Sequence, residues 1–582
     1  MIALSRDISD HTPLLLNTGV ASSDSNQPTF KFELGWLLRD GFMDMVKKVW
    51  SEEDTGSTPM EKWQAKIRRL RQFLRGWAKN VSAANKKEKK DILDPLDAMD
   101  KKAEHSFLST REIDVKQCLK NRIAKLLCEE EIKWYQRAKT KDLLEGDSNT
   151  KYFQLIANGK HRKTRIFQIH DGNKVISGDR DLKKFITTYY KGLFGPPEEN
   201  NFRLDETCKD DIPQVTDLEN EALVERFTQE EVRKAIFHME HNKAPGPDGF
   251  PAEFYQAFWG TIKDDLMALF EDFHNGTLPL FSLNFGTIIL LPKCKEASRI
   301  QQYRPICLLN VSFKIFTKVA TNRITTVAQK IISPTQTAFL LGRNIMEGVV
   351  ILHETIHELH KTKQNGVIFK IDYEKAYDKV KWSFVKQTLE MKGFSHKWCQ
   401  WVDSFMRGGH VGIKINDQVG QDFQTKKGLR QGDPLSPILF NIVADMLAIL
   451  INRAKVQGQI KGVIPHLIDD GLSILQYADD TILFMDHDLE KAINLKLLLC
   501  AFEQLSGLKV NFHKSEIFCF GEAQQCEAQY SQLFGCQTGN YPFKYLGIPM
   551  HLRKLSNGDW NIIEQRFEKK LSSWKGKHLS VG

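Results

Sequence analysis

The stretch that decides the fold is Ser473-Ile474-Leu475-Gln476-Tyr477-Ala478-Asp479-Asp480-Thr481-Ile482-Leu483-Phe484. Two short runs rich in β-forming residues flank the adjacent carboxylates Asp479 and Asp480. This pattern predicts a β-hairpin with the acid pair at its tip. Two neighbouring negative charges repel each other, and a divalent cation shared with a third carboxylate would relieve that repulsion. A solvated polar turn could have the same sequence, so the surrounding motifs must decide between the two.

The composition is that of a multidomain protein with a large core. The chain has 582 residues, of which 41% are hydrophobic and 27% are charged. No uninterrupted apolar run approaches the length of a transmembrane helix, so we expect no membrane partner. The net charge of +9 permits an anionic partner. The ten cysteines include no Cys-x-x-Cys pair, which argues against a zinc ribbon or a disulfide scaffold and indicates an intracellular compartment.

The first part of the chain has a helical pattern with many charges. Between residues 34 and 144, apolar residues recur at steps of three and four, as in Trp63, Ile67, Leu70, Leu74 and Trp77. The charged run 86–90 is interpreted as a solvated helix face. The basic run 160–165 follows an aromatic pair at 152–153, and it predicts either a nucleic-acid contact or a plain surface cluster.

Further candidate site residues lie at the ends of apolar runs. The run 366–371 predicts a strand that ends at Asp372, which is suited either to metal chemistry or to capping the next helix. Lys293 and Arg304 adjoin two other apolar runs and could grip a triphosphate, although ordinary edge-strand charges would look the same.

A tight turn is predicted at residues 428–435. Asp433 is expected to be the N-cap of the following helix and Pro434 its first residue. Gln431 and Gly432 would then lie at a helix N-terminus, where backbone can approach a ligand closely.

Seven motifs in this order resemble the reverse transcriptases of non-LTR (LINE-type) retrotransposons, most closely those of plants. The match runs from about residue 144 to the end of the sequence. The motifs are Lys243-Ala244-Pro245-Gly246-Pro247-Asp248-Gly249, Tyr303-Arg304-Pro305-Ile306, Ile371-Asp372 with Ala376-Tyr377-Asp378, residues 428–437, Tyr477-Ala478-Asp479-Asp480, Ser506-Gly507-Leu508-Lys509 and Lys544-Tyr545-Leu546-Gly547.

The resemblance implies an α+β fold of the right-hand polymerase type and a nucleotidyl transfer that uses two Mg²⁺ ions about 4 Å apart, or Mn²⁺ in their place. Asp372 and Asp479 would bridge both ions, while Asp480 would assist the primer-side ion. The backbone carbonyl of Tyr373 would complete the nucleotide-side metal site. Tyr377 would be the ring that excludes a ribose 2′-hydroxyl.

The resemblance assigns further binding roles. Lys293, Arg304, Gln431 and Gly432 would contact the nucleotide. Lys514 would lie beside the pyrophosphate as a proton donor, unless it is simply a solvent-exposed loop lysine. A hairpin would grip the primer strand or form a small hydrophobic unit, or do both; its residues are Phe543, Tyr545, Leu546 and Gly547.

The resemblance also suggests a division of the chain. Residues 1–20, which include Ser9-Asp10-His11, would be the C-terminal remnant of an apurinic-type endonuclease domain without endonuclease activity. Residues 21–205 would form a helical N-terminal extension that includes the basic segment. Residues 206–365 would form the fingers, 366–550 the palm, and 551–582 the start of a shortened thumb.

The expected function is RNA-directed DNA polymerase activity with an RNA template, a DNA primer and dNTPs. A retrotransposon RNA-binding protein would be a further partner, and the nucleus or a cytoplasmic ribonucleoprotein the location. Two alternatives remain. One is a group II intron-type reverse transcriptase, which Ser9-Asp10-His11 disfavours. The other is a catalytically silent remnant that binds nucleic acid.

Overall fold

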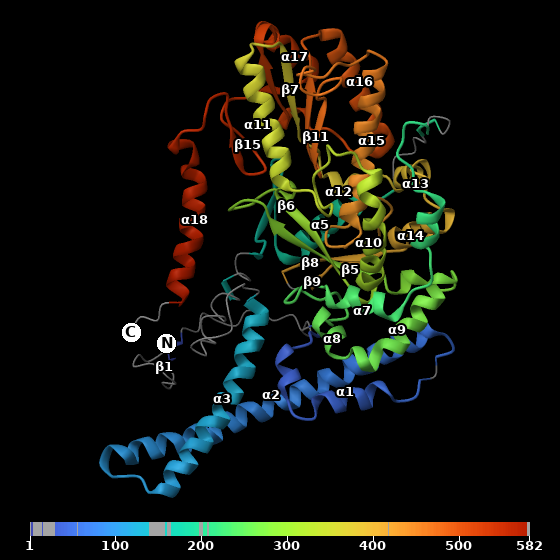
Figure 1. The fold of residues 1–582 in the computed structure, drawn as a ribbon. Coiled ribbons are helices and arrows are strands. Elements are labelled where there is room, and N and C mark those ends of the chain that lie inside the picture. Colours follow the sequence, from blue (N-terminus) through green and yellow to red (C-terminus); the bar gives the residue numbers. More distant parts are fainter. Residues whose placement is uncertain are drawn as a thin grey trace.

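The computed structural model describes residues 2–3, 14–15, 29–54, 56–138, 158–159, 164–196, 202–205, 209–416 and 418–578. The predictions for Ser9-Asp10-His11, for Tyr152 and Phe153, and for most of the basic run 160–165 lie outside the described residues. Figure 1 shows two sheets surrounded by helices, with long helices extending from one end of the molecule. This mixed α and β architecture agrees with the expected α+β class.

The predicted helical pattern in the first part of the chain is confirmed. The elements are η1 (Leu34–Leu38), α1 (Phe42–Trp50), α2 (Pro59–His105) and α3 (Thr110–Ala138). Trp63, Leu70 and Leu74 are buried on one face of α2. A threonine capping box at Thr58 begins α2, since Thr58 accepts from the Glu61 amide while the Glu61 carboxylate accepts from the Thr58 amide.

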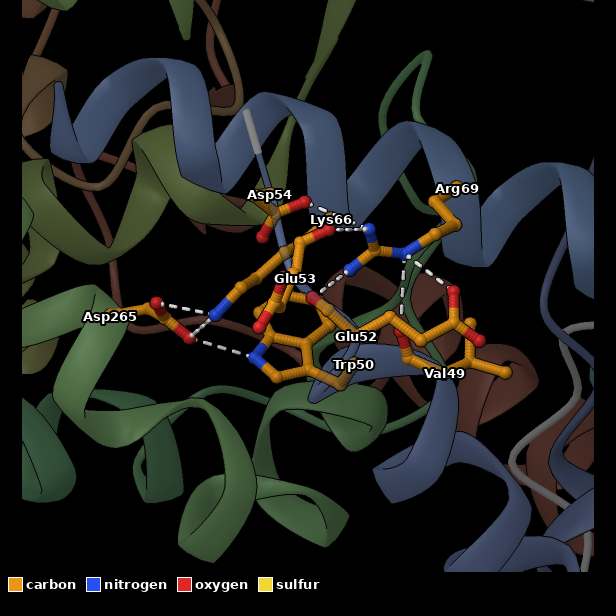
Figure 2. Close-up of polar contacts among 8 residues, drawn as sticks. All are labelled: Val49, Trp50, Glu52, Glu53, Asp54, Lys66, Arg69 and Asp265. Atoms are coloured by element: carbon orange, nitrogen blue, oxygen red, sulfur yellow. Dashed lines mark hydrogen bonds and ion pairs between the residues drawn. The ribbon is translucent and has the colours of Figure 1, made fainter. Parts of the chain in front are cut away.

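A polar network fixes α1 and α2 to α9 (Trp259–His274), as Figure 2 shows. Arg69 donates to the carbonyls of Val49 and Glu52, which lie at and just beyond the end of α1. Lys66 Nζ contacts both Asp265 carboxylate oxygens at 2.8 and 2.9 Å. The half-buried Lys66 and Asp265 therefore tie the first helices to the body of the molecule.

Short elements connect this extension to the first large sheet. They are β3 (Gln168–Asp171), β4 (Lys174–Ser177), α5 (Asp179–Leu193), α6 (Asp217–Leu223), α7 (Gln229–Phe237), α8 (Ala252–Ala257) and η2 (Leu280–Ser282). A phenylalanine-rich core joins α8 and α9 to the residues before α1, with Phe32 packed edge-on against Phe254.

The first five-stranded sheet has the order β10-β8-β5-β6, with β9 paired to β8. The two apolar runs that Lys293 and Arg304 adjoin form an antiparallel pair of strands. Strand β8 pairs in parallel with β5. A strand from the range 366–550, which the sequence assigned to the palm, therefore belongs to the same sheet as β5 and β6. Its elements are β5 (Phe285–Pro292), η3 (Ile300–Gln302), β6 (Tyr303–Leu309), β8 (His410–Ile415), β9 (Gln418–Val419) and β10 (Phe423–Gln424).

The second sheet has the order β11-β12-β7-β13-β14. Its central strand β7 pairs with β12 on one side and β13 on the other, both antiparallel. The strands are β7 (Gly366–Ile371), β11 (Ile474–Tyr477), β12 (Asp480–Met485), β13 (Glu516–Phe520) and β14 (Gln537–Thr538).

Helices cover this sheet and link it to the first one. They are α10 (Val311–Ile331), α11 (Ile345–Lys361), α12 (Ala376–Lys379), α13 (Trp382–Met391), α14 (His396–Met406), α15 (Ser436–Val456), α16 (Leu489–Ser506), η4 (Phe512–Lys514), η5 (Gly521–Cys526) and α17 (Glu527–Phe534). Among the described residues, α15 is the one helix long and apolar enough to cross a membrane. Of its most apolar window, 78% is buried inside the protein, as in a core helix.

The last elements are the hairpin β15 (Phe543–Tyr545) with β16 (Ile548–Met550), and α18 (Asn557–His578). Figure 1 shows α18 standing beside the body rather than within it. Phe567 and Leu571 of α18 are 64% and 51% exposed, and the helix contacts β16.

Candidate active site

The stretch that decided the fold forms the predicted β-hairpin. Tyr477 pairs with Asp480 at its end, and Ala478 and Asp479 form the two-residue turn. Ala478 adopts φ 55°, in the left-handed region, and its buried methyl group fixes the inner side of the turn. Asp479 is thereby presented at the tip and Asp480 at the first position of β12.

Strand β7 brings Asp372 to the same edge. Ile371 pairs with Thr481, so continuing the register by one residue places Asp372 opposite Asp480. The Asp372 backbone is fixed from its other side, because its amide donates to Ser515 Oγ at 3.1 Å and its carbonyl accepts from Asn511 at 2.7 Å. Strands far apart in the sequence thus deliver three carboxylates to one edge of the sheet.

The three carboxylates share one electrostatic environment. Each reaches solvent, yet surrounding protein atoms reduce its solvation, and this partial burial raises the pKa of Asp372, Asp479 and Asp480. Repulsion from Asp479 raises the pKa of both other carboxyls further. Lys514 acts in the opposite direction on Asp372. The cluster is therefore an anionic site in which a cation would be stabilised.

The first sheet supplies cations to this site. Leu291 pairs with Arg304, and the Lys293 amide donates to the Gln302 carbonyl at 2.8 Å, so Lys293 and Arg304 leave the same end of the β5–β6 pair. Both side chains are exposed. The charges of Arg304 and Lys293 lower the pKa of Asp479 against the effect of burial. The structure thus brings both residues toward the carboxylates.

Two tyrosines follow Asp372. The backbone of Tyr373, which directly follows Asp372, forms an isolated antiparallel bridge with Val510. The ring of Tyr377 stacks on Phe440 of α15, with the ring centres 4.3 Å apart and an angle of 17° between the planes. Burial, and then the nearby Asp479, raises the pKa of the Tyr377 phenol. Tyr377 is therefore a fixed ring next to the anionic cluster.

The turn before α15 lies against β6. The Cys307 amide donates to the Gln431 carbonyl at 2.8 Å. Gly432 has φ 113°, and a Cβ at this position would lie 2.6 Å from the Cys307 carbonyl oxygen, so only glycine fits without a shift. This contact places Gln431 and Gly432 beside the strand that carries Arg304.

The predicted start of α15 is wrong by about two residues. The helix begins at Ser436 with Leu435 as its N-cap and Pro437 in its first turn. Asp433 is buried instead, and its carboxylate accepts the Leu435 amide at 3.3 Å. The Asp433 carboxylate is thus hydrogen-bonded within a local turn that ends before the helix begins, so it cannot cap the helix. Burial raises the pKa of Asp433.

Sequence reasoning missed a buried group below the site. Asp378 is 2% exposed, and its carboxylate accepts from Gln431 Nε2 at 3.4 Å. Lys375, which adopts φ 50°, donates to Tyr189 Oη at 2.7 Å. Burial raises the pKa of Asp378 and lowers that of Lys375, while their opposite charges act against both changes. The tyrosine comes from α5, so this contact could not be read from motif spacing.

The hairpin tip also depends on a residue that the motifs did not include. Gln336 is fully buried, and its Oε1 accepts from the amides of Ala338 at 3.2 Å and Ala478 at 2.8 Å. The segment that carries Gln336 forms an added bridge to Gln476 of β11. Gln336 therefore holds the turn that presents Asp479.

The β15–β16 hairpin lies next to the same edge. Leu546 and Gly547 form its turn with φ 50° and 89°, which is the geometry that two-residue hairpin turns favour. Phe543 and Tyr545 are buried in the second core cluster. The charge of Asp480 contributes to the raised pKa of Tyr545, after burial. The hairpin is thus a hydrophobic unit whose half-exposed turn adjoins the site.

The donor set suits a hard divalent cation, because carboxylate oxygens and a backbone carbonyl are the ligands that Mg²⁺ prefers. In the part of the chain that the structure describes, no group of three Asp, Glu, His or Cys side chains is close enough to coordinate a metal ion by itself. Mg²⁺ characteristically keeps several waters and takes other ligands from substrate phosphates. Asp372, Asp479 and Asp480 therefore fit a site that a phosphorylated substrate completes.

Comparison with known proteins agrees with this chemistry. Residues 291–550 match the family described as "Reverse transcriptase (RNA-dependent DNA polymerase)". A transposon TX1 uncharacterized 149 kDa protein of Xenopus laevis is 26% identical over 520 residues, which cover 87% of this chain and 38% of that protein. The Pol polyprotein of the type-2 retrotransposable element R2DM of Drosophila melanogaster is 26% identical over 382 residues, covering 63% of this chain and 33% of the relative.

A short plant relative matches a smaller part. An uncharacterized mitochondrial protein of Arabidopsis thaliana is 44% identical over 55 residues, which cover 10% of this chain and 45% of that protein. The match spans 38% of the length of the TX1 protein and 33% of that of the R2DM protein.

Proposed function

We propose that this chain, whose residues 291–550 match the reverse transcriptase family and which is similar to retrotransposon proteins, is a LINE-type RNA-directed DNA polymerase that adds dNTPs to a primer 3′-hydroxyl. One observation carries the proposal. Strand β7 and the β11–β12 hairpin bring Asp372, Asp479 and Asp480 to one sheet edge, and Lys293 and Arg304 lie close enough to act on that cluster electrostatically.

The proposed layout is a right hand. Residues 206–365 form the fingers, 366–550 the palm and 551–582 the start of the thumb, behind an N-terminal extension at 21–205. The β5–β6 pair supports the fingers assignment because it carries the cationic side chains, while the β7 sheet supports the palm assignment because it carries the carboxylates. Residues 1–20 are proposed to derive from an endonuclease domain.

Asp372 and Asp479 would hold the two metal ions, with Asp480 assisting at the primer side and the Tyr373 carbonyl at the nucleotide side. Bound Mg²⁺, or Mn²⁺ in its place, would supply activation of the primer hydroxyl and stabilisation of the leaving pyrophosphate. The contribution of the chain itself is to fix the backbone that carries these carboxylates, through Ser515 and Asn511 at Asp372 and through Gln336 at the hairpin turn.

The cationic side chains are proposed to bind the nucleotide phosphates. Arg304 can form two parallel hydrogen bonds to phosphate oxygens, whereas Lys293 acts as a point charge. Lys514 lies close enough to Asp372 to lower its pKa, and this position suits a proton donor to pyrophosphate. These residues would neutralise charge on the triphosphate.

Sugar and strand contacts complete the proposed site. Tyr377, fixed by its stack on Phe440, would exclude a ribose 2′-hydroxyl. Gln431 and Gly432 would lie along the nucleotide and the template. The turn at Leu546 and Gly547 would contact the primer strand, with Phe543 and Tyr545 anchoring it in the core. An RNA template, a DNA primer and a retrotransposon RNA-binding protein are the proposed macromolecular partners.

Primer extension tests this function. The purified chain is incubated with an annealed DNA primer on an RNA template, Mg²⁺, and either dNTPs or rNTPs. The proposal predicts extension with dNTPs that stops when EDTA is added. Absence of extension, together with a shift of labelled RNA, would instead identify a nucleic-acid-binding protein without polymerase activity.

A further inference from the structure

The first two thirds of α2 carry a concentrated positive charge. Between Pro59 and Lys90 there are eleven lysines and arginines but only two glutamates, so this segment has a charge of +9, equal to the net charge of the whole chain. One of those glutamates, Glu61, is engaged in the capping box that begins the helix. The excess charge is therefore local rather than spread over the surface.

Five of these cations form one line. At 3.6 residues per turn they fall within an arc of about 60° around the helix axis and extend over about 33 Å along it. All five are exposed, and the positions between them on this line hold Gln72, Ser82 and Ala83 rather than acids. We call them the basic row: Arg68, Arg75, Lys79, Lys86 and Lys90.

The basic row lies away from the faces that α2 uses for packing. Trp63, Leu70 and Leu74 are buried, and they lie on the other side of the helix from the row. Glu88 faces α3 and pairs with Arg122 there. Figure 1 shows α2 and α3 at the end of the molecule opposite the sheet that carries the carboxylates.

Some cations of this segment are engaged in ion pairs, among them Lys66, Arg69 and Lys89. Within the described part of the chain, none of the five members of the basic row has an ion pair. Five other cations of the same two helices each have a carboxylate partner. We call these the paired set: Lys89, Lys101, Lys102, Lys116 and Arg122. Like charges four residues apart on a helix repel each other slightly, and a polyanion lying along the row would relieve this repulsion.

We propose that the basic row binds the phosphate backbone of an RNA strand that continues beyond the active site. A polyanion that follows the helix axis matches the length and the single sign of the row, and its binding would release condensed counterions. Lysines and arginines that contact phosphates position a strand but do not recognise its bases, so we expect the basic row to bind RNA without sequence specificity. The choice of RNA rests on the proposed function, in which RNA is the template.

The test compares two variants of the full chain with equal net charge. In the row variant, each member of the basic row is changed to Gln. In the control variant, each member of the paired set is changed to Gln. Circular dichroism checks that both retain their helices. Binding of a labelled single-stranded RNA, long enough to span the active site and the basic row, is then measured across a range of salt concentrations.

We expect the row variant to bind this RNA at least about tenfold more weakly at physiological salt. The slope of the logarithm of its binding constant against the logarithm of salt concentration should become shallower by about 0.7 for each phosphate that the row no longer neutralises. The control variant should bind as the wild type does. An equal decrease in affinity in both variants, or no decrease in either, would overturn the proposal. The same two variants are also tested with a labelled duplex DNA. If the row variant loses more affinity for the DNA than for the RNA, the assignment to an RNA strand is overturned.

This outcome is separable from that of the proposed function. Primer extension on a template too short to reach the basic row should proceed equally in the wild type and the row variant if the chain is a polymerase. If the chain extends no primer but the row variant still binds RNA more weakly, the polymerase proposal fails and the binding surface stands.

Discussion

Gln336 Oε1 accepts a hydrogen bond from the Ala478 amide at 2.8 Å, so a fully buried side chain holds the turn on which Asp479 is presented. The two residues are 142 positions apart in the sequence. A carboxylate at a hairpin tip would be mobile if only its own two strands held it. The bond to Gln336 instead couples the tip to the segment between α10 and α11.

Replacing Gln336 with Ala should therefore damage both stability and catalysis. Two buried amides would be left without their acceptor, and each unsatisfied amide costs about 1–3 kcal/mol. We expect the free energy of unfolding, measured by urea denaturation, to fall by at least that amount. We also expect kcat for primer extension to fall more than KM for the dNTP rises. Gln525→Ala, at an exposed site, is the matched control; similar decreases in both variants would argue against the positioning role.

Gly432→Ala should be more harmful than Gly458→Ala. Both glycines have positive φ, but a Cβ at Gly458 meets nothing within 4 Å, whereas one at Gly432 would lie 2.6 Å from the Cys307 carbonyl oxygen. The left-handed backbone costs about 1 kcal/mol in either variant. The additional clash should shift the turn that carries Gln431 and lower nucleotide affinity. Steady-state kinetics of both variants check this; equal effects would contradict it.

Tyr377→Val should relax the choice of sugar. The ring is fixed by its stack on Phe440, and under the proposed function its removal would open the space that a ribose 2′-hydroxyl needs. Adding or removing a group of this size in a binding pocket changes the ratio of kcat/KM for two competing substrates by about tenfold or more. The ratio of kcat/KM for dNTP and rNTP should fall accordingly, whereas Tyr377→Phe should retain it. An unchanged ratio in the valine variant would exclude the steric role.

Asp248→Asn should change how stability depends on pH. Burial raises the pKa of Asp248 to about 6, and its carboxylate accepts the Phe250 amide at 3.0 Å. Because the folded state then holds a proton that the unfolded state has already released, wild-type stability falls as pH rises from about 4 to about 6.

Asn keeps the acceptor but cannot ionise. Above pH 6 the variant should be more stable than the wild type by up to about 3 kcal/mol, at about 1.4 kcal/mol per pKa unit, and near pH 4 the two should agree. Urea unfolding at both pH values measures this. If Asp248→Asn were equally less stable than the wild type near pH 4 and above pH 6, ionisation of Asp248 would cost the folded state no stability.

The sequence predicted the elements whose signal is local. The β11–β12 hairpin, the strand ending at Asp372 and the β5–β6 pair each follow from alternating or continuous apolar runs. The prediction that Asp433 is an N-cap rested on local preference and is wrong. Its carboxylate accepts a hydrogen bond from the Leu435 amide in a turn that ends before the helix starts.

Contacts between distant segments could not be predicted. Gln336 belongs to no motif, and Tyr189 approaches Lys375 from an α-helix 186 positions away. The basic row was hidden for a different reason: the run 86–90 alone looks like a solvated face, and only a continuous α2 aligns it with Arg68 and Arg75. Side-chain partners depend on how elements pack, which periodicity does not specify.

The most direct test of the central claim is primer extension on an RNA template by the wild type, Asp479→Ala and the control Asp469→Asn, whose acid lies exposed in a loop. If the carboxylate cluster holds the catalytic cations, Asp479→Ala should be slower by at least about a thousandfold while binding RNA as before. Removing a metal ligand removes several kcal/mol of transition-state stabilisation, and about 1.4 kcal/mol is tenfold in rate. Asp469→Asn should match the wild type. Extension by Asp479→Ala at the wild-type rate would contradict the account.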